Sequence, residues 1–420
     1  MTLTSTSFVV LKSVSAGIAF ASLLGVPAAL AASSTSPTQL KTVAQTDASS
    51  GLTWMNQHAG AANQDWTGIA GYAVGRAPSS SNAVVNAMVG EVSKLKASTD
   101  YARFILALLA GAQDPHNFAG KNFVSALAAA QFKSGADVGK FADNINGTGT
   151  DLINSQAWSI IALEDAGGAN YNRAAAATWL LHQQNADGGF GYSHTYSSSD
   201  PDDTASALVA LRLLGYHATD PQIVKALHYL QTQQATDGGF ENGATTSNSD
   251  STGVVTDALL AYGISPLTWQ QTGGNPVTSL LGYYDSKSGG FNYDNTGSSW
   301  SGVSAYSTRD SVIGLSAFLN GQSVYQRLHW TSLGSLNPYW ENVYQHHGLW
   351  LFHHWYSWQN VRVMAVAGSY AYQLTPAWQT VVKDHGMKVN GKWESWDIHL
   401  ATQAVVARYG LDTLHMNGLA

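Results

Sequence analysis

The sequence WLLHQQNADGGFGYSHTYSSSDPDDTASALVALRLLG, residues 179–215, contains every kind of segment that recurs along this chain. An apolar helical segment leads into a glycine turn that ends at Phe190. A polar loop follows, and it carries three carboxylates, at Asp200, Asp202 and Asp203, before a second apolar segment begins. Much of the remaining chain consists of variations on this unit.

The glycine turn recurs at a nearly constant interval. Its phenylalanines are 49, 50 and 51 residues apart, and the four copies are Gly139-Lys140-Phe141, Asp187-Gly188-Gly189-Phe190, Asp237-Gly238-Gly239-Phe240 and Ser288-Gly289-Gly290-Phe291. A fixed period carried by one turn and two helices is typical of repeat proteins, in which each hairpin buries its apolar face against its neighbours. Glycine suits the end of a helix because it adopts the left-handed conformation without a Cβ penalty.

Two kinds of helical segment alternate between these turns. Inner helices, apolar nearly all round and expected to be buried on several sides, are predicted to start at Asp65, Asp100, Asp151, Asp203, Asp250, Tyr306, Ser357 and Ser395. Outer helices, with the apolar spacing of a surface helix, are predicted at 82–96, 123–132, 173–184, 221–234, 276–285 and 375–384. An open solenoid needs polar caps at its ends, and no cap is evident. We therefore predict an all-α fold, an α/α toroid of about six or seven hairpins around a central funnel.

Composition limits the classes of partner and chemistry. The chain has 420 residues, of which 45% are hydrophobic and only 11% charged, so it can bury a large core. A formal net charge of -7 without a basic run gives no electrostatic footprint for nucleic acid or an anionic membrane surface. The absence of cysteine excludes disulfides, thiolate metal sites and cysteine nucleophiles.

Four regions are expected along the chain. Residues 1–31 are typical of a secretory signal peptide, with an uncleaved membrane anchor as the alternative, so we expect a secreted protein. Residues 32–50 are rich in Ser, Thr and Gln and are predicted to be a flexible lead-in. Residues 51–322 are predicted to form the toroid repeats, and residues 323–420 a C-terminal helical region that completes or covers the toroid. No later segment is long and apolar enough for an integral membrane helix in the mature chain.

The turns QQNADGGF (residues 183–190) and QQATDGGF (residues 233–240) resemble the Q-x-x-D-G-G-F/W repeats of the terpenoid cyclase, squalene cyclase and protein prenyltransferase superfamily. The resemblance is specific over about residues 100–321 and implies the α/α toroid fold. The signal peptide and residues 141–163 look most like a secreted bacterial branch, and the chain is similar at a distance to the toroid of intrinsic factor and transcobalamin. The prenyltransferase branch needs a zinc ion held by Asp, Cys and His, which a chain without cysteine cannot supply.

The segment Asp200-Pro201-Asp202-Asp203-Thr204-Ala205 resembles the D-x-D-D-T-A motif of class II terpene cyclases, enzymes of the isomerase or lyase type. The resemblance implies that Asp202 donates a proton to an alkene and that Asp200 and Asp203 support it. Neighbouring carboxylates in a low dielectric cannot all ionise, so at least one stays protonated. Aromatic faces would hold the resulting cation and an apolar, isoprenoid or sterol-like ligand. The candidates are Trp158, Tyr262, Trp300, Tyr306, Trp355 and Trp358; no cofactor or metal is implied.

The same aspartates have a structural interpretation. Asp65, Asp100, Asp151 and Asp250 stand at comparable helix starts, where a carboxylate caps free backbone N–H groups and meets the positive end of the helix dipole. On this interpretation the protein is a non-catalytic secreted binding module for a corrinoid-like cofactor, a glycan or another protein. The mature length barely provides one toroid, and no D-D-x-x-D diphosphate motif is present.

A histidine-rich and tryptophan-rich segment spans residues 345–358. Its histidines, at His346, His347, His353 and His354, are interpreted as hydrogen-bonding groups in an interface rather than as a metal or cofactor site, because adjacent histidines on a helix point in different directions. A glycosidase on an α/α barrel is a further alternative that no spacing selects.

Overall fold

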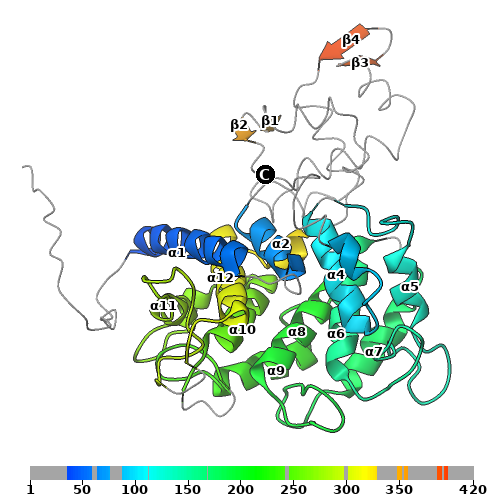
Figure 1. The fold of residues 1–420 in the computed structure, drawn as a ribbon, viewed down its shortest axis with the longest axis horizontal. Coiled ribbons are helices and arrows are strands. Elements are labelled where there is room, and N and C mark those ends of the chain that lie inside the picture. Colours follow the sequence, from blue (N-terminus) through cyan, green and yellow to red (C-terminus); the bar gives the residue numbers. More distant parts are fainter. Residues whose placement is uncertain are drawn as a thin grey trace, which may run out of the picture.

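Six helices pack side by side into a closed ring in the computed structural model, which describes residues 36–58, 64–75, 88–111, 113–167, 169–241, 246–297, 301–328 and the backbone of four short strands beyond residue 347. The ring consists, in chain order, of α2 (Gln64–Ala73), α4 (Ser98–Ala110), α6 (Ile153–Ala166), α8 (Pro201–Leu213), α10 (Ser249–Ala261) and α12 (Ala305–Asn320). Each packs against the next, and α12 packs against α2 (Figure 1). The predicted α/α toroid is confirmed, and the first six predicted inner helices are the ring helices.

A second set of helices covers the outside of the ring. They are α1 (Pro37–His58), α5 (Phe123–Ala129), α7 (Arg173–His182), α9 (Pro221–Thr232) and α11 (Pro276–Gly282), with a 3-10 turn, η2 (Pro266–Thr268), before α11. Their starts follow from the sequence, because Asn122, Asn172 and Asn275 cap α5, α7 and α11 with their side chains. The outer helix predicted at 82–96 is described only from residue 88 and is helical only to residue 91.

The phenylalanine of each glycine turn is completely buried, at 0% exposure for Phe141, Phe190, Phe240 and Phe291. The turns leave no room for a side chain at the left-handed glycine. Gly188 has φ of 94°, and a Cβ atom there would lie 2.5 Å from the carbonyl oxygen of Lys225 in α9. Each hairpin is therefore set against the backbone of the next outer helix, which explains why the turn sequence recurs.

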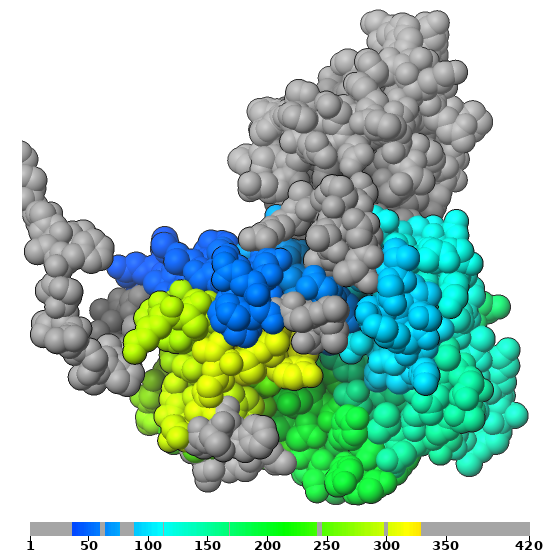
Figure 2. Space-filling model, viewed as in Figure 1, coloured from blue at the N-terminus to red at the C-terminus, as the bar shows by residue number. Residues whose placement is uncertain are grey.

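Helix α1 acts as the outer helix that receives the last turn. A Cβ atom on Gly290 would lie 3.1 Å from the Trp54 ring, and one on Gly51 would lie 3.0 Å from the Phe291 ring. Figure 2 shows the blue surface of α1 lying against the yellow-green and yellow surface of the last repeat, and α1 packs on both α11 and α12. The first and last hairpins thus complete the ring together.

The lead-in predicted at 32–50 is therefore wrong from Pro37 onward. The buried positions of α1 are Leu40, Ala44, Ala48, Gly51, Leu52 and Met55, with Asp47 and Trp54. This is a helical spacing, but within residues 37–50 the buried positions are Leu40, Ala44, Asp47 and Ala48, so that stretch has little hydrophobicity to signal burial.

A short helix, α13 (Val324–Arg327), joins three of the ring helices. The Tyr72 hydroxyl of α2 donates to the Arg327 carbonyl oxygen at 2.5 Å. The Val324 amide donates to Asp257 of α10 at 2.7 Å, and Tyr325 packs edge to face on Trp158 of α6 with ring centroids 5.4 Å apart. The chain following α12 therefore ties the ring across its interior.

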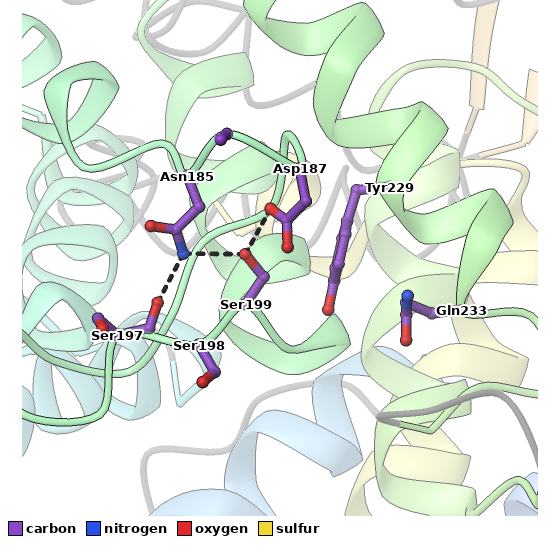
Figure 3. A pocket seen from close by; sticks show the side chains of 8 residues that line it. Asn185, Asp187, Ser197, Ser198, Ser199, Tyr229 and Gln233 are labelled. Carbon is purple, nitrogen blue, oxygen red and sulfur yellow. Dashed lines mark hydrogen bonds between the residues drawn. The ribbon is translucent and has the colours of Figure 1, made fainter.

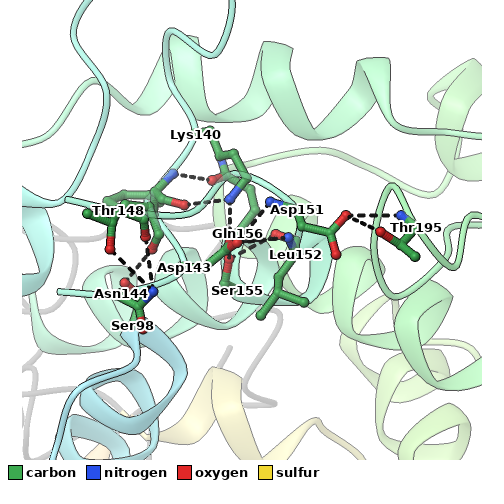
Figure 4. Close-up of polar contacts among 12 residues, drawn as sticks. Ser98, Lys140, Asp143, Asn144, Thr148, Asp151, Leu152, Ser155, Gln156 and Thr195 are labelled. Carbon is green, nitrogen blue, oxygen red and sulfur yellow. Dashed lines mark hydrogen bonds and ion pairs between the residues drawn. The ribbon is translucent and has the colours of Figure 1, made fainter. Parts of the chain in front are cut away.

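A buried lysine fixes the loop before α6 (Figure 4). Lys140 is 0% exposed, and its Nζ donates to the Phe141 carbonyl oxygen at 2.9 Å and to Asp143 Oδ1 at 2.7 Å. Burial lowers the pKa of Lys140, and the hydrogen bond from its ammonium to Asp143 opposes this. Asp143 also accepts the Asp151 amide at 2.8 Å, so a side chain from the preceding turn satisfies the start of α6.

The C-terminal part contains two antiparallel hairpins. Strand β1 (Gly348–Leu351) pairs with β2 (His354–Ser357), and β3 (Gly386–Val389) pairs with β4 (Lys392–Ser395). The prediction of a C-terminal helical region is wrong at these strands. Strands β2 and β4 end where inner helices were expected to start, at Ser357 and Ser395. The helix predicted at 375–384 and the predicted signal peptide lie outside the described residues. Within the described part of the chain, no helix has the length and apolarity to cross a membrane.

Candidate functional site

The N-terminal ends of the ring helices face one mouth of the toroid, here called the N-terminal mouth. Between successive ring helices an outer segment returns the chain, so the ring helices all run in the same direction. The residues just inside these N-termini therefore belong to one surface. Those of α8, α10 and α12 carry an acidic cluster, of which the sequence analysis predicted Asp200, Asp202 and Asp203 as a site.

Asp200 is the cap of α8. Its carboxylate accepts the Asp203 amide at 2.8 Å, its backbone is extended at φ -138°, and Pro201 takes the first helical position. These are the properties of an N-cap followed by the residue best suited to the first turn. The capping interpretation is confirmed for Asp200.

Asp203 and Thr204 are used inside the ring. Asp203 is buried and accepts the Asn154 amide of α6 at 2.7 Å, and burial raises its pKa well above the ordinary value, with the charge of Asp200 adding to the effect. Thr204 Oγ1 accepts the Phe190 backbone N–H at 2.9 Å. Thr252 and Thr308 do the same for Phe240 and Phe291, at 3.0 Å and 3.1 Å. The threonine of the D-P-D-D-T segment therefore has the same role in three repeats, where it accepts the backbone N–H of the buried phenylalanine.

Asp202 neither caps α8 nor is buried as Asp203 is. Its side chain is exposed, yet loss of hydration to the surrounding protein raises its pKa to about 7, with further contributions from the charges of Asp200, Asp310 and Asp250 and an opposing hydrogen bond from Ser251. A carboxyl group that solvent reaches but protein largely surrounds lies in a concave part of the surface. Asp202 therefore lines the N-terminal mouth and faces α10 and α12.

The threonine positions reveal a register that sequence analysis missed. Asp202 stands two residues before Thr204, and Asp250 and Tyr306 stand two residues before Thr252 and Thr308. Asp250 is thus the equivalent of Asp202, although the sequence interpretation treated it as a cap. Asn248 caps α10 instead, and burial together with Asp310 raises the pKa of Asp250 to about 6, against an opposing effect of Arg309.

The capping prediction varies among the other aspartates. Asp100 accepts the Ala97 amide at 2.9 Å and so does help to cap α4. Asp65 accepts the Trp66 amide at 2.7 Å and forms an ion pair with Arg103. Asp151 is no cap, because it accepts the Thr195 amide at 3.0 Å from the next repeat. A carboxylate at the start of an inner helix therefore takes different roles in different repeats.

A cation is already held over aromatic faces beside the acidic cluster. Arg309 of α12 donates to Asp310 through Nε at 2.7 Å and through Nη2 at 2.5 Å. Its guanidinium carbon lies 4.4 Å from the Trp66 ring centroid and 5.2 Å from that of Tyr306. Trp66, Arg309 and Asp310 were not among the predicted site residues, because only the closed ring brings α2 beside α12.

The predicted aromatic residues separate into three groups. Trp158 lies inside the ring between Trp66 and Tyr325, and Tyr306 is 58% exposed at the N-terminal mouth. Tyr262 follows the C-terminal end of α10, where its hydroxyl donates to the Leu208 carbonyl oxygen at 2.9 Å, so it is away from the acidic cluster. Three lie outside the side chains that the structure describes: Trp300, Trp355 and Trp358, the second of which is in β2.

The acidic cluster does not have the arrangement of a metal site. Across the residues whose side chains the structure describes, no group of three or more His, Cys, Asp or Glu could hold a metal ion. Of the histidines predicted to lie in an interface, His346, His347 and His353 lie outside the described residues, and His354 is described by its backbone alone.

The match between this chain and a known protein family lies in the repeat region. Residues 126–245 match the family model of the squalene-hopene cyclase N-terminal domain. This match confirms, over that segment, the resemblance to the terpenoid cyclase and squalene cyclase superfamily. No match was found among curated proteins.

Two solved structures are similar at low identity. Candida albicans protein geranylgeranyltransferase-I complexed with GGPP is 15% identical over 53% of this chain and 67% of that chain, with a TM-score of 0.41. The ent-copalyl diphosphate synthase from Streptomyces platensis is 15% identical over 61% of this chain, with a TM-score of 0.40. The match covers 49% of the synthase, so this chain spans about half of its length.

Proposed function

We propose that the protein is a squalene-cyclase-like toroid that binds an apolar, isoprenoid or sterol-like ligand at its N-terminal mouth and protonates it from Asp202. One observation carries the proposal. Asp202 is the carboxyl group of the D-P-D-D-T segment that does not cap α8, and it is exposed at the N-terminal mouth, where Ser251 of α10 donates a hydrogen bond to it and its pKa is raised to about 7.

The chemistry requires a protonated carboxyl group facing an alkene. With its pKa raised to about 7, Asp202 keeps a protonated population at neutral pH. In the proposed step the Asp202 O–H bond breaks, the alkene π electrons form a new C–H bond, and the neighbouring carbon becomes positive. The Asp250 carboxylate at the same mouth would stabilise that charge.

The second candidate function is binding without chemistry. Arg309 already occupies the faces of Trp66 and Tyr306, and its fixed positive charge would oppose a carbocation at those rings. This observation favours the non-catalytic binding module. The predicted signal peptide suits either function with a neutral lipid, since an exported protein has no access to cytosolic diphosphates.

Incubation of the purified protein with squalene or a polyprenol in detergent, followed by mass spectrometry of the lipid extract, tests the proposal. A new product is expected from the wild type and from Asp220→Asn, a matched control just before outer helix α9, and none from Asp202→Asn. Product formation should fall as the pH rises through about 7, because the acid form of Asp202 is the donor. Ligand binding without product would favour the second candidate, and an unchanged product in Asp202→Asn would exclude Asp202 as the donor.

A further inference from the structure

A polar pocket of about 480 Å³ opens beside the glycine turn that precedes α8 (Figure 3). Residues 185–187 of the turn and residues 197–199 of the following loop form one side, and Tyr229 and Gln233 at the end of α9 form the other. The pocket is separate from the Asp202 site in its lining residues. Its volume lies within the range of small-molecule sites.

Hydrogen bonds fix the polar groups on the turn side. Asn185 Nδ2 donates to the Ser197 carbonyl oxygen at 2.6 Å and to Ser199 Oγ at 2.9 Å, and Ser199 Oγ donates to Asp187 Oδ1 at 2.7 Å (Figure 3). Asp187 Oδ1 also accepts the Gly189 amide at 2.9 Å. Within the described residues, neither the amide oxygen of Asn185 nor the second carboxylate oxygen of Asp187 accepts a hydrogen bond. Two acceptors are therefore held in place and left for a ligand.

Tyr229 supplies the opposite wall. It is 3% exposed, and its hydroxyl is buried with no hydrogen-bond partner among the described residues. In Figure 3 the hydroxyl end lies between Ser199 and Gln233. Burial raises the pKa of Tyr229, and the charges of Asp200 and Asp187 raise it further, so the hydroxyl keeps its proton. A buried hydroxyl without a partner costs free energy in the absence of a ligand.

The next repeat contains a closed version of the same arrangement. There Ser247 Oγ contacts both Asp237 and the Tyr283 hydroxyl in very short hydrogen bonds, so the three side chains satisfy one another. Asp237 and Ser247 correspond to Asp187 and Ser199, but the tyrosine lies one helical turn later, at the position of Gln233. In the repeat with the pocket, the glycine turn and its aspartate are the same, but the tyrosine is at position 229. Its hydroxyl is then unpaired, and the pocket is open.

We propose that this pocket binds a neutral sugar ring. Its lining has one carboxylate and no cationic side chain, which disfavours phosphates and other anions. The side-chain amides, carboxylate and hydroxyls offer both donors and acceptors, as vicinal sugar hydroxyls require. Two exposed tyrosines on the same loop, Tyr192 at 44% and Tyr196 at 72%, provide apolar faces for the C–H face of a sugar.

Titration of the full protein with glucose, galactose, mannose and N-acetylglucosamine, followed by NMR or calorimetry, tests this proposal. Saturable binding of at least one sugar with a Kd in the millimolar range is expected. Tyr229→Phe and Asp187→Asn should each weaken it about tenfold, the loss expected for one hydrogen bond. The matched control Tyr283→Phe should bind as the wild type does, because it alters only the closed site.

Thermal unfolding separates a ligand role from a structural one. Tyr229→Phe removes an unpaired hydroxyl, so its Tm should equal or exceed that of the wild type, whereas Tyr283→Phe loses a hydrogen bond and should melt earlier. Three outcomes would overturn the proposal: no sugar binding to the folded protein, sugar binding unaffected in both pocket variants, or binding of spermidine or inorganic phosphate in place of every sugar.

Discussion

Replacing Gly253 by alanine would force apart the two ring helices that approach most closely at a glycine. A Cβ atom at Gly253 of α10 would lie 2.2 Å from the carbonyl oxygen and 2.5 Å from the carbonyl carbon of Asp310 in α12. Gly314 of α12 packs back onto Gly253, with 2.8 Å between its added Cβ and the Gly253 carbonyl oxygen. Both obstacles are backbone atoms, which cannot rotate out of the way as a side chain would.

The magnitude follows from that contact. An ordinary carbon–oxygen contact needs more than 3 Å, so α12 must shift by about 1 Å. Overpacking of this kind costs about 1–3 kcal/mol, and the upper end applies because two helix backbones must move. The change from glycine to alanine inside a helix returns up to about 1 kcal/mol. We therefore expect Gly253→Ala to lower the free energy of unfolding by about 2 kcal/mol.

Urea unfolding followed by far-UV circular dichroism measures the effect, with Gly71→Ala as the control. Gly71 lies in ring helix α2, and a Cβ atom there would meet nothing within 4 Å. The control should therefore gain up to about 1 kcal/mol from helix propensity alone. If Gly253→Ala gained as much as Gly71→Ala, α10 and α12 could not be in backbone contact at this position.

Two further predictions concern the repeat turns and the buried acids. Thr252→Val removes the hydroxyl that accepts the Phe240 amide, and it should lower the free energy of unfolding in urea by about 1–3 kcal/mol. The control is Thr268→Val, on the exposed η2 turn. If Thr252→Val lowered the free energy of unfolding no more than this control does, the assigned role of Thr252 would be contradicted. Burial raises the pKa of Asp257 to about 6 from an ordinary 3.8, so between these values the folded chain binds more protons than the unfolded chain. Stability should consequently fall as the pH rises from about 4 to above 6, and a higher urea midpoint at pH 7 than at pH 5 would refute this.

The period of the glycine turns was sufficient to predict the ring. A buried phenylalanine every fifty residues or so, between apolar and amphipathic segments, has few solutions other than stacked hairpins, and the alternation located the helices from α4 to α12. Helix α1 was not predicted because its buried positions within residues 37–50 are Leu40, Ala44, Asp47 and Ala48, whose burial leaves little trace in hydropathy. The strands after residue 347 were not predicted, because the aromatic residues near Ser357 fit a buried helix as well as a hairpin.

The candidate site could be predicted only in part, because its residues have partners in other repeats. The D-P-D-D-T segment located the acids, but the role of each depends on partners from other repeats, such as Asn154 for Asp203. The equivalence of Asp202 and Asp250 depends on which hydroxyl accepts the phenylalanine amide, and that hydrogen bond has no signature in the sequence. Arg309 and Trp66 meet only because the two ends of the repeat region meet.

The hydrogen bond from Tyr72 to Arg327 joins residues 255 positions apart, and it sets an order of events during synthesis. Helix α1 leaves the ribosome before the ring helices, yet much of the surface that buries it belongs to α11 and α12, whereas α2 also packs against α4, the next ring helix. Intermediate repeats can begin to pack as they emerge, while α1 must wait, solvated, for α11 and α12. Because the entropy of closing so long a loop grows only slowly with its length, the delay costs time more than stability. For a chain predicted to be exported, that waiting period is the time during which α1 is still unpacked.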